Sequence, residues 1–471
     1  ADPHEIANVF GVRGVAALAE AAARLPFTFG VCASSCVPAS PFESPGAEVG
    51  VPELEELLDD VGAVAVAEVM NYPAVIAGDP EFRAKIAAAH GRRVDGHTPG
   101  LRGAQLDAYL AAGVESDHES TELDEIEEKR RKGMWVFVRQ GSAGKNLIAL
   151  IPTVLRHGVE RVALCTDDRE PDTLLELGHV NDCVRLAVAA GVLEADALVL
   201  ATANAAEYHR FTNLGSLGPG YQADILCFDD LRSWEPARVW RAGELVAVDG
   251  RVVDGAVPAT PPPDWMRQSV HLAHHPTAVE LTLDPVPNRA KVIGVEPGSL
   301  STRELILDVT DPGVDVARIA VLERHHATGR VGLGYTSGFG LRRGAIASTV
   351  AHDAHNCMVV GAIGPHGPAD MAVAAARLAE LGGGQVAVLN GRVLDDVRLE
   401  IGGLMSNRTV DEMARALARL VEVAREELGV TLEAPFMQLS FLGLSVIPEL
   451  RITDKGLVDV MTFELTDVAV T

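Results

Sequence analysis

Basic residues are scarce in this 471-residue chain, and the shortage limits what it can bind. The sequence has 40 Lys and Arg against 66 Asp and Glu, which gives a formal net charge of −26 at pH 7. Proteins that follow nucleic-acid phosphates need clustered Lys and Arg. The composition therefore argues against nucleic acid as a partner. Such acidity is more typical of a surface that maintains solubility.

Cysteines and long apolar runs are also few. The six cysteines are scattered and form no CxxC pair, so we expect reduced thiols in a cytoplasmic protein and no disulfide framework. No stretch approaches the roughly 20 apolar residues of a membrane helix, so we expect no membrane partner. An initiator Met is missing, and the first residues, ADPHE, look like the tail of a buried strand. We therefore expect the natural N-terminus to lie upstream.

Two catalytic motifs are missing as well. No GxxxxGK[ST] phosphate loop occurs in the sequence, which argues against a nucleoside triphosphate site. The HxE…PCxxC pattern is also absent, and its absence excludes a zinc site of the cytidine-deaminase type.

The length of the chain predicts two or three domains, because 471 residues are too many for one hydrophobic core. Between Pro26 and Thr212, strand-like segments such as FTFGVCASS, GAVAVAEV and RVALCTDD alternate with helical patterns. This alternation predicts a parallel sheet covered by helices. Short antiparallel strands follow, with Asp249-Gly250 as a type I′ turn. A proline-rich linker at 258–265 then leads to a mixed α and β region.

Acidic and histidine residues stand at the ends of successive strand-like segments. The intervals between them are 21 to 29 residues, which is the length of a βα unit. The residues are Glu68, His97, His118, Arg139 and Asp167. A β/α barrel builds its active site from such strand ends. Imidazoles and carboxylates that converge there are the ligands expected for a divalent metal that activates water. The pattern predicts a metal-dependent hydrolase.

Each of these residues also has a purely structural explanation. Glu68 could be a solvated acid at a strand end, and a lone His97 or His118 is more often a hydrogen-bonded structural histidine than a ligand. Asp167 and Asp168 could cap a helix instead of binding a cation.

Two further segments can likewise be explained either as structural or as functional. The RQGSAGKNL segment, with Arg139 and Ser142, could bind a substrate oxygen or anion, or could be an ordinary turn. The VAHDAHN segment, with His352 and His355, could be a surface turn, an internal hydrogen-bonded cluster or a functional group of residues.

The motifs, taken in order, resemble the adenine deaminase family of the amidohydrolase superfamily. They are DPHEIANV, SCVPAS, EVMN, DGHTPGLRG, SDHES, GSAGKNL, TDDREP and GHVNDCVR. Later segments, including GFGLRRGAIASTVAHDAHN and PFMQLSFLGLSVIPELRITDKGLVDV, resemble the C-terminal domain of that family. The resemblance covers essentially the whole chain.

The resemblance implies an α/β fold. We expect a TIM-type (β/α)8 metallo-hydrolase barrel whose first strand is missing, with strands 2–8 in residues 1–212. A small β-sandwich segment at 213–257, a linker at 258–279 and a C-terminal α+β domain at 280–471 would follow.

The resemblance also implies a reaction, the hydrolysis of adenine to hypoxanthine and ammonia by a metal-activated hydroxide, in purine salvage or adenine catabolism. It implies a binuclear centre of manganese or iron, with zinc as a third option. The implied metal ligands are Glu68, the bridging carboxylate, and His97, His118 and Asp167. Asp167 would also move the proton to the leaving amine. Chemical inference, and not the resemblance, adds Glu119, which is well placed to exchange a proton with a purine ring nitrogen.

The remaining expectations concern substrate contacts and assembly. Arg139, Ser142 and Asp168 are the candidate substrate-binding residues. The substrate is the small molecule adenine, and we expect a cytoplasmic homo-oligomer, a dimer in the first instance.

The sequence departs from the family pattern in two places. The His-x-His pair of the first strand is absent, and Gln140 replaces the acid of the usual REGS segment. We therefore expect this chain to bind fewer than two metal ions and to deaminate adenine negligibly, unless other residues, first of all His4, supply the ligands. The alternatives are another amidohydrolase, either an adenosine-type deaminase or a cyclic-amide hydrolase, or an inactive truncated fragment.

Overall fold

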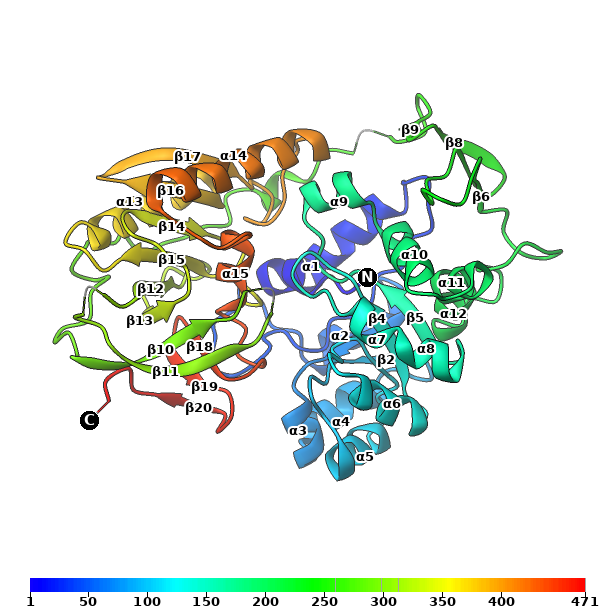
Figure 1. The fold of residues 1–471 in the computed structure, drawn as a ribbon, viewed down its shortest axis with the longest axis horizontal. Coiled ribbons are helices and arrows are strands. Elements are labelled where there is room, and N and C mark those ends of the chain that lie inside the picture. Colours follow the sequence, from blue (N-terminus) through cyan, green and yellow to red (C-terminus); the bar gives the residue numbers. More distant parts are fainter. Residues whose placement is uncertain (259, 298, 312, 471) are drawn as a thin grey trace. The chain divides into compact units, whose positions relative to one another are not determined.

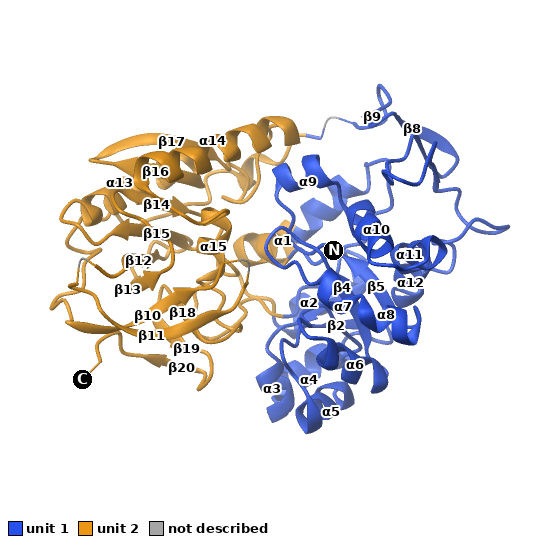
Figure 2. Cartoon of the chain, in the orientation of Figure 1, with its two compact units in different colours: residues 1–3, 15–35, 50–260 blue, residues 4–14, 36–49, 261–471 orange. Residues whose placement is uncertain are grey.

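The computed structural model describes residues 1–258, 260–297, 299–311 and 313–470. The chain divides into two compact units (Figure 1, Figure 2). Unit 1 comprises residues 1–3, 15–35 and 50–260, and unit 2 comprises residues 4–14, 36–49 and 261–471. In the described ranges, no helix combines the length and the apolar character needed to cross a membrane.

Parallel strands form the centre of unit 1. They are β1 (Ala65–Val69), β2 (Arg93–Gly96), β3 (Ser116–Asp117), β4 (Trp135–Arg139) and β5 (Val162–Cys165). β1 pairs with β2, and β3, β4 and β5 pair in that order, all in parallel. The Glu115 amide donates to the Val94 carbonyl at 2.9 Å and so connects β2 to β3. Consecutive strands are therefore neighbours, and their carboxyl ends meet at one edge.

The segment before β1 continues this order without forming a regular strand. Ala33 makes a parallel bridge to Val66, although FTFGVCASS was predicted to be a full strand. The prediction that ADPHE ends a strand is wrong from His4 onward, because helix α1 (His4–Ala22) begins there. The helix is interrupted at Gly11, whose φ is 61°.

Helices connect the strands of unit 1. They are α2 (Val51–Asp59), α3 (Tyr72–Ala77), α4 (Pro80–Ala87), α5 (Gly103–Ala111), α6 (Leu123–Arg131), α7 (Leu147–Leu150), α8 (Pro152–His157), α9 (Pro171–Leu177), α10 (Val180–Ala189), α11 (Glu194–Ala201) and α12 (Ala203–Tyr208). The alternation of strand and helix confirms the predicted α/β architecture, as sequential β and α units require. Closure into an eight-stranded barrel stays a prediction.

An antiparallel sheet follows the last of these helices. It has the order β6 (Ile225–Cys227), β7 (Arg238–Arg241), β8 (Glu244–Val248) and β9 (Arg251–Val252). Asp249 and Gly250 join the last two strands with φ values of 48° and 73°. Positive φ at both positions is the signature of the predicted type I′ turn. The predicted sandwich arrangement and domain boundaries stay predictions.

Unit 2 contains an eight-stranded sheet. Its spatial order is β11 (Thr302–Asp308), β10 (Arg289–Val295), β13 (Val331–Ser337), β12 (Ala317–Leu322), β15 (Cys357–Ala362), β14 (Ala345–Ser348), β16 (Gly384–Leu389) and β17 (Arg392–Arg398). A smaller sheet consists of β18 (Leu450–Thr453), β19 (Gly456–Asp459) and β20 (Glu464–Thr466). The short helix η1 (Asp264–Met266) precedes both sheets.

Helices cover both faces of the large sheet. Ile319 and Val321 of β12 belong to the same buried cluster as residues of α14 (Val410–Leu428) and α15 (Pro435–Phe441). Ala320 and Leu322, which alternate with them, belong to a second cluster with α13 (Gly367–Leu381). Successive residues of a strand point to opposite faces, so α13 lies on one side of the sheet and α14 and α15 lie on the other.

Candidate metal-binding active site

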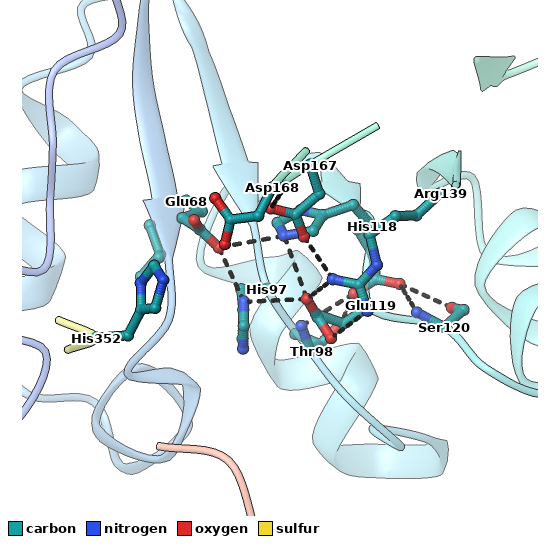
Figure 3. A network of polar contacts seen from close by, with 12 residues as sticks. Glu68, His97, Thr98, His118, Glu119, Ser120, Arg139, Asp167, Asp168 and His352 are labelled. Carbon is teal, nitrogen blue, oxygen red and sulfur yellow. Dashed lines mark hydrogen bonds and ion pairs between the residues drawn. The ribbon is translucent and has the colours of Figure 1, made fainter. Parts of the chain in front are cut away.

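Five polar side chains project from the carboxyl ends of the parallel strands in unit 1 (Figure 3). Glu68 lies in β1, His97 directly follows β2, His118 directly follows β3, Arg139 ends β4, and Asp167 follows β5. The predicted convergence of Glu68, His97, His118 and Asp167 is confirmed by the contacts described below, whereas their role as metal ligands stays a prediction.

Two imidazoles meet one carboxylate at the centre of this group. Glu68 Oε2 lies 2.8 Å from His97 Nδ1 and 3.2 Å from His118 Nε2. Glu68, His97 and His118 can each offer one ligand atom within 4.8 Å of the others. The same holds for a second set, His118 with Glu119 and Asp167. Nitrogen and carboxylate oxygen ligands suit zinc, iron and manganese.

The electrostatics of the centre favour positive charge. Burial opposes ionisation of Glu68, but the facing imidazoles of His118 and His97 lower its pKa well below the ordinary value. Burial opposes the charge of His118 as well, yet Glu68 and then Glu119 raise its pKa to about 10. Without a metal, the acidic side chains thus draw protons onto the imidazoles. A divalent cation is the other species that these carboxylates can attract.

A buried arginine connects two of the carboxylates. Arg139 is 2% exposed, and its guanidinium donates to Asp167 Oδ2 at 2.6 Å and to both oxygens of Glu119. The pKa of Asp167 lies below its ordinary value, since the charge of Arg139 outweighs the opposing desolvation. Asp167 also has a left-handed φ of 56°. Such backbone strain in a non-glycine residue is concentrated at functional sites.

A second ion-pair network lies behind the histidines, and the sequence analysis missed it. Lys129 of α6 has no exposed side-chain surface and donates to Asp117 at 3.0 Å, to Glu125 at 2.7 Å and to the Thr98 carbonyl at 2.7 Å. Asp117 accepts from the Thr98 amide at 2.9 Å and from the Ser120 amide at 3.0 Å. Burial opposes ionisation of Asp117, but Lys129 holds its pKa well below the usual range.

This network fixes the backbone beside both histidines, because Thr98 follows His97 and Asp117 precedes His118. A signal for it was present in the sequence. Glu125 and Lys129 are four residues apart on one helix, which is the spacing of an ion pair.

The remaining candidate residues form the turns around the site. The Ser142 amide donates to the Asp168 carbonyl at 2.9 Å, and the Ser142 hydroxyl accepts from the Glu170 amide at 2.9 Å. The Asp168 amide donates to Asp167 Oδ1 at 2.8 Å. Gln140, at the position of the usual acid, pairs through its backbone with Lys145. The structure therefore brings Ser142 and Asp168 into the turns next to Asp167.

Comparison with known proteins identifies the family to which the chain belongs. Residues 1–253 match the amidohydrolase family, and residues 299–464 match the adenine deaminase C-terminal domain. The first match covers more than half of the chain, which therefore belongs to the amidohydrolase family.

Individual relatives narrow the assignment. The chain is 42% identical to adenine deaminase 2 of Carboxydothermus hydrogenoformans, an alignment that covers 99% of this chain and 82% of the relative. It is 43% identical to an adenine deaminase of Nitratidesulfovibrio vulgaris, with 100% and 82% covered. It is 41% identical to one of Brucella melitensis, with 98% and 79% covered. Within the amidohydrolases, the chain is a member of the adenine deaminase family.

Proposed function

We propose that this chain is an adenine deaminase, an enzyme that hydrolyses adenine to hypoxanthine and ammonia. The observation that carries the proposal is the approach of His97 Nδ1 and His118 Nε2 to within 3.2 Å of one oxygen of Glu68. Two imidazoles and a carboxylate at parallel strand ends form a ligand set for a catalytic metal. The names of the relatives supply the substrate.

The proposed metal ligands are Glu68, His97, His118 and Asp167. These four side chains would hold two divalent ions, and Glu68, one oxygen of which meets both imidazoles, is the carboxylate that we propose the ions would share. The nitrogen and oxygen atoms of these side chains suit manganese, iron or zinc. When bound, such ions lower the pKa of water, so that hydroxide is available near neutral pH.

Asp167 and Glu119 are the proposed proton carriers. The lowered pKa of Asp167 keeps it ionised at neutral pH, so it is ready to accept a proton from the attacking water and to pass it to the departing amino group. The ring carbon then loses ammonia. Glu119 is held by both of its oxygens against Arg139, which fixes its direction for proton exchange with a ring nitrogen.

Arg139, Ser142 and Asp168 remain the proposed substrate-binding residues. The guanidinium of Arg139 orients the carboxylates of Glu119 and Asp167. Its positive charge can at the same time face a polar group of the purine. Ser142 and Asp168 would contact the base from their turns. We propose in addition that the parallel strands belong to a (β/α)8 barrel and that the enzyme is a cytoplasmic homo-oligomer.

The proposal is tested by the release of ammonia from adenine and from adenosine, and by the ring opening of a cyclic amide, using protein loaded with manganese or iron. We expect ammonia from adenine alone. This differs from the negligible activity expected from the sequence, because the similarity to adenine deaminases over nearly the whole chain favours an active enzyme over an inactive fragment. Ammonia from adenosine, or opening of the cyclic amide, in place of ammonia from adenine would assign the chain to a different amidohydrolase activity. Metal content measured on the same samples decides between the two catalytic ions proposed here and the smaller number expected from the sequence.

A further inference from the structure

Unit 2 contains its own buried group of histidine and carboxylate side chains. His4 begins α1, and His352 and Asp353 lie in the loop between β14 and β15. All three belong to unit 2, and all are partly or fully buried. His4 is the residue that the sequence offered first for the missing catalytic ligands, whereas His352 and Asp353 are not among the metal ligands or proton carriers proposed above.

The distances between the nitrogen and oxygen atoms of these side chains suit ligands of one metal ion better than direct hydrogen bonds. Asp353 Oδ1 lies 3.3 Å from His352 Nδ1 and 3.6 Å from His4 Nε2. Protein N–H···O hydrogen bonds usually measure about 2.7–3.2 Å. Two ligands held about 2.0–2.2 Å from a tetrahedral ion are separated by roughly 3.3–3.6 Å. The three side chains can place their ligand atoms within 4.8 Å of one another.

A second observation points to a missing ligand at Asp353. The residue is 1% exposed, and its other oxygen, Oδ2, has no hydrogen-bond partner among the described residues. A buried carboxylate oxygen without a partner is costly. A cation bound to this carboxylate would remove that cost.

A small cavity beside His352 leaves room for one water molecule. A cavity of about 10 Å³ lies against Glu43, His352 and His355, close to the smallest volume that holds one water. His355 Nδ1 accepts from the Ala351 amide at 3.1 Å, which leaves Nε2 to carry the proton. That Nε2 is buried and has no partner among the described residues, so it can donate to a water in the cavity.

Glu43 adds a further carboxyl group to the same wall. It is 3% exposed, and burial, followed by the charge of Asp353, raises its pKa to about 8. Glu43 therefore adds a carboxyl group to this wall in a setting with little solvent.

We propose that His4, His352 and Asp353 bind one divalent transition-metal ion, additional to those of the catalytic centre. Two imidazoles and a carboxylate favour zinc or iron over calcium and magnesium. The ion connects the first residue of α1 to the β14–β15 loop, and its binding stabilises unit 2 against unfolding.

The first test is metal stoichiometry. Protein stripped with a chelator is titrated with zinc, and bound zinc is measured by elemental analysis. We expect Asp353→Asn and His352→Gln each to bind one equivalent less than the unaltered chain, because loss of a ligand weakens binding by roughly 100-fold or more. His274→Gln, which removes an exposed imidazole of unit 2, is the matched control and retains full stoichiometry. Equal zinc content in all four proteins would overturn the proposal.

A second test does not depend on the folding of these variants. In the double variant His97→Gln/His118→Gln, unit 2 keeps its sequence while both histidines among the four proposed catalytic ligands are removed. We expect this protein to bind one equivalent of cobalt(II) with the absorption of a four-coordinate nitrogen and oxygen site, and to unfold at a higher temperature when cobalt is bound. Absence of cobalt binding would contradict the further site, whereas the proposed deaminase activity is tested separately by ammonia release.

Discussion

At the scale of single residues, Asp167 combines a strained backbone with a close ion pair. Its φ is 56°, and its Oδ2 accepts a hydrogen bond from the Arg139 guanidinium at 2.6 Å. A carboxylate with a lowered pKa is ionised at neutral pH, and the same shift makes it a weaker base. The strain is consistent with a position selected for chemistry and not for local stability.

We predict that Asp167→Asn reduces deamination by about 10²–10⁴-fold while the protein stays folded, because an amide cannot carry the proton. Ammonia release and a circular dichroism spectrum check the two parts. Asp230→Asn, at an exposed loop carboxylate, is the control and should retain full turnover. An Asp167→Asn enzyme with more than about a tenth of the original rate would be incompatible with the proton-transfer role.

At the scale of elements, α6 supports the active site through a lysine that the solvent does not reach. Lys129 bridges Asp117 and Glu125 and also holds the carbonyl of Thr98. Removal of one partner from a buried ion pair leaves charge without compensation.

We predict that Lys129→Met destabilises the protein by roughly 3–5 kcal/mol and weakens metal binding by about 10–100-fold. Denaturant unfolding and zinc titration measure the two effects. Lys132→Met, one turn away on the more exposed side of the same helix end, should change stability by less than about 1 kcal/mol. Unchanged metal affinity in Lys129→Met would show that this network does not position the histidines.

The helix α14 offers a separate test of local stability. Thr409 accepts from the Glu412 amide, and Glu412 accepts from the Thr409 amide at 2.9 Å, which completes a capping box. We predict that Thr409→Ala costs about 1 kcal/mol, and that Thr409→Ser, which keeps the hydroxyl, costs much less. Denaturant unfolding compares the two; an equal loss in both would mean that the hydroxyl is not the stabilising group.

Local sequence signals predicted the elements better than the contacts between them. The Asp249-Gly250 turn between β8 and β9, with φ values of 48° and 73°, and the strand–helix alternation of unit 1 were both predicted. Such features depend on neighbours in sequence. The strand predicted at residues 1–5 was wrong, because a short polar segment has no periodicity that separates a strand from a helix start.

The active-site positions were predictable for a different reason. Polar residues at strand ends recur at βα spacing, so the convergence of Glu68, His97 and His118 follows from topology. The double pairing of Arg139 and the burial of Lys129 depend on side-chain directions across several elements. Sequence spacing does not carry that information.

At the scale of the whole molecule, stability depends on pH through buried histidines. Burial, followed by the charge of Arg324, lowers the pKa of His325 from 6.5 to about 3. The unfolded chain takes up a proton near pH 6.5, whereas the folded chain does so only near pH 3. Folded stability is therefore lost as the pH falls through this window.

We predict that the His325 contribution lowers stability by roughly 2 kcal/mol between pH 7.5 and pH 5.0. Denaturant unfolding at the two pH values measures the change. His325→Gln should reduce this pH dependence, while His157→Gln, at an exposed imidazole, should leave it as it was. An unaltered pH dependence in His325→Gln would exclude this histidine as a source of the acid sensitivity.

The central claim is that a metal centre held by Glu68, His97 and His118 deaminates adenine. The most direct measurement is ammonia release from adenine and from adenosine by the manganese-loaded chain, beside the same protein carrying Glu68→Gln. We predict release from adenine, none from adenosine, and a loss of at least about 10²-fold in the variant, since a neutral amide is a poor bridging ligand. Release from adenosine alone, or equal rates with and without the Glu68 carboxylate, would contradict the account.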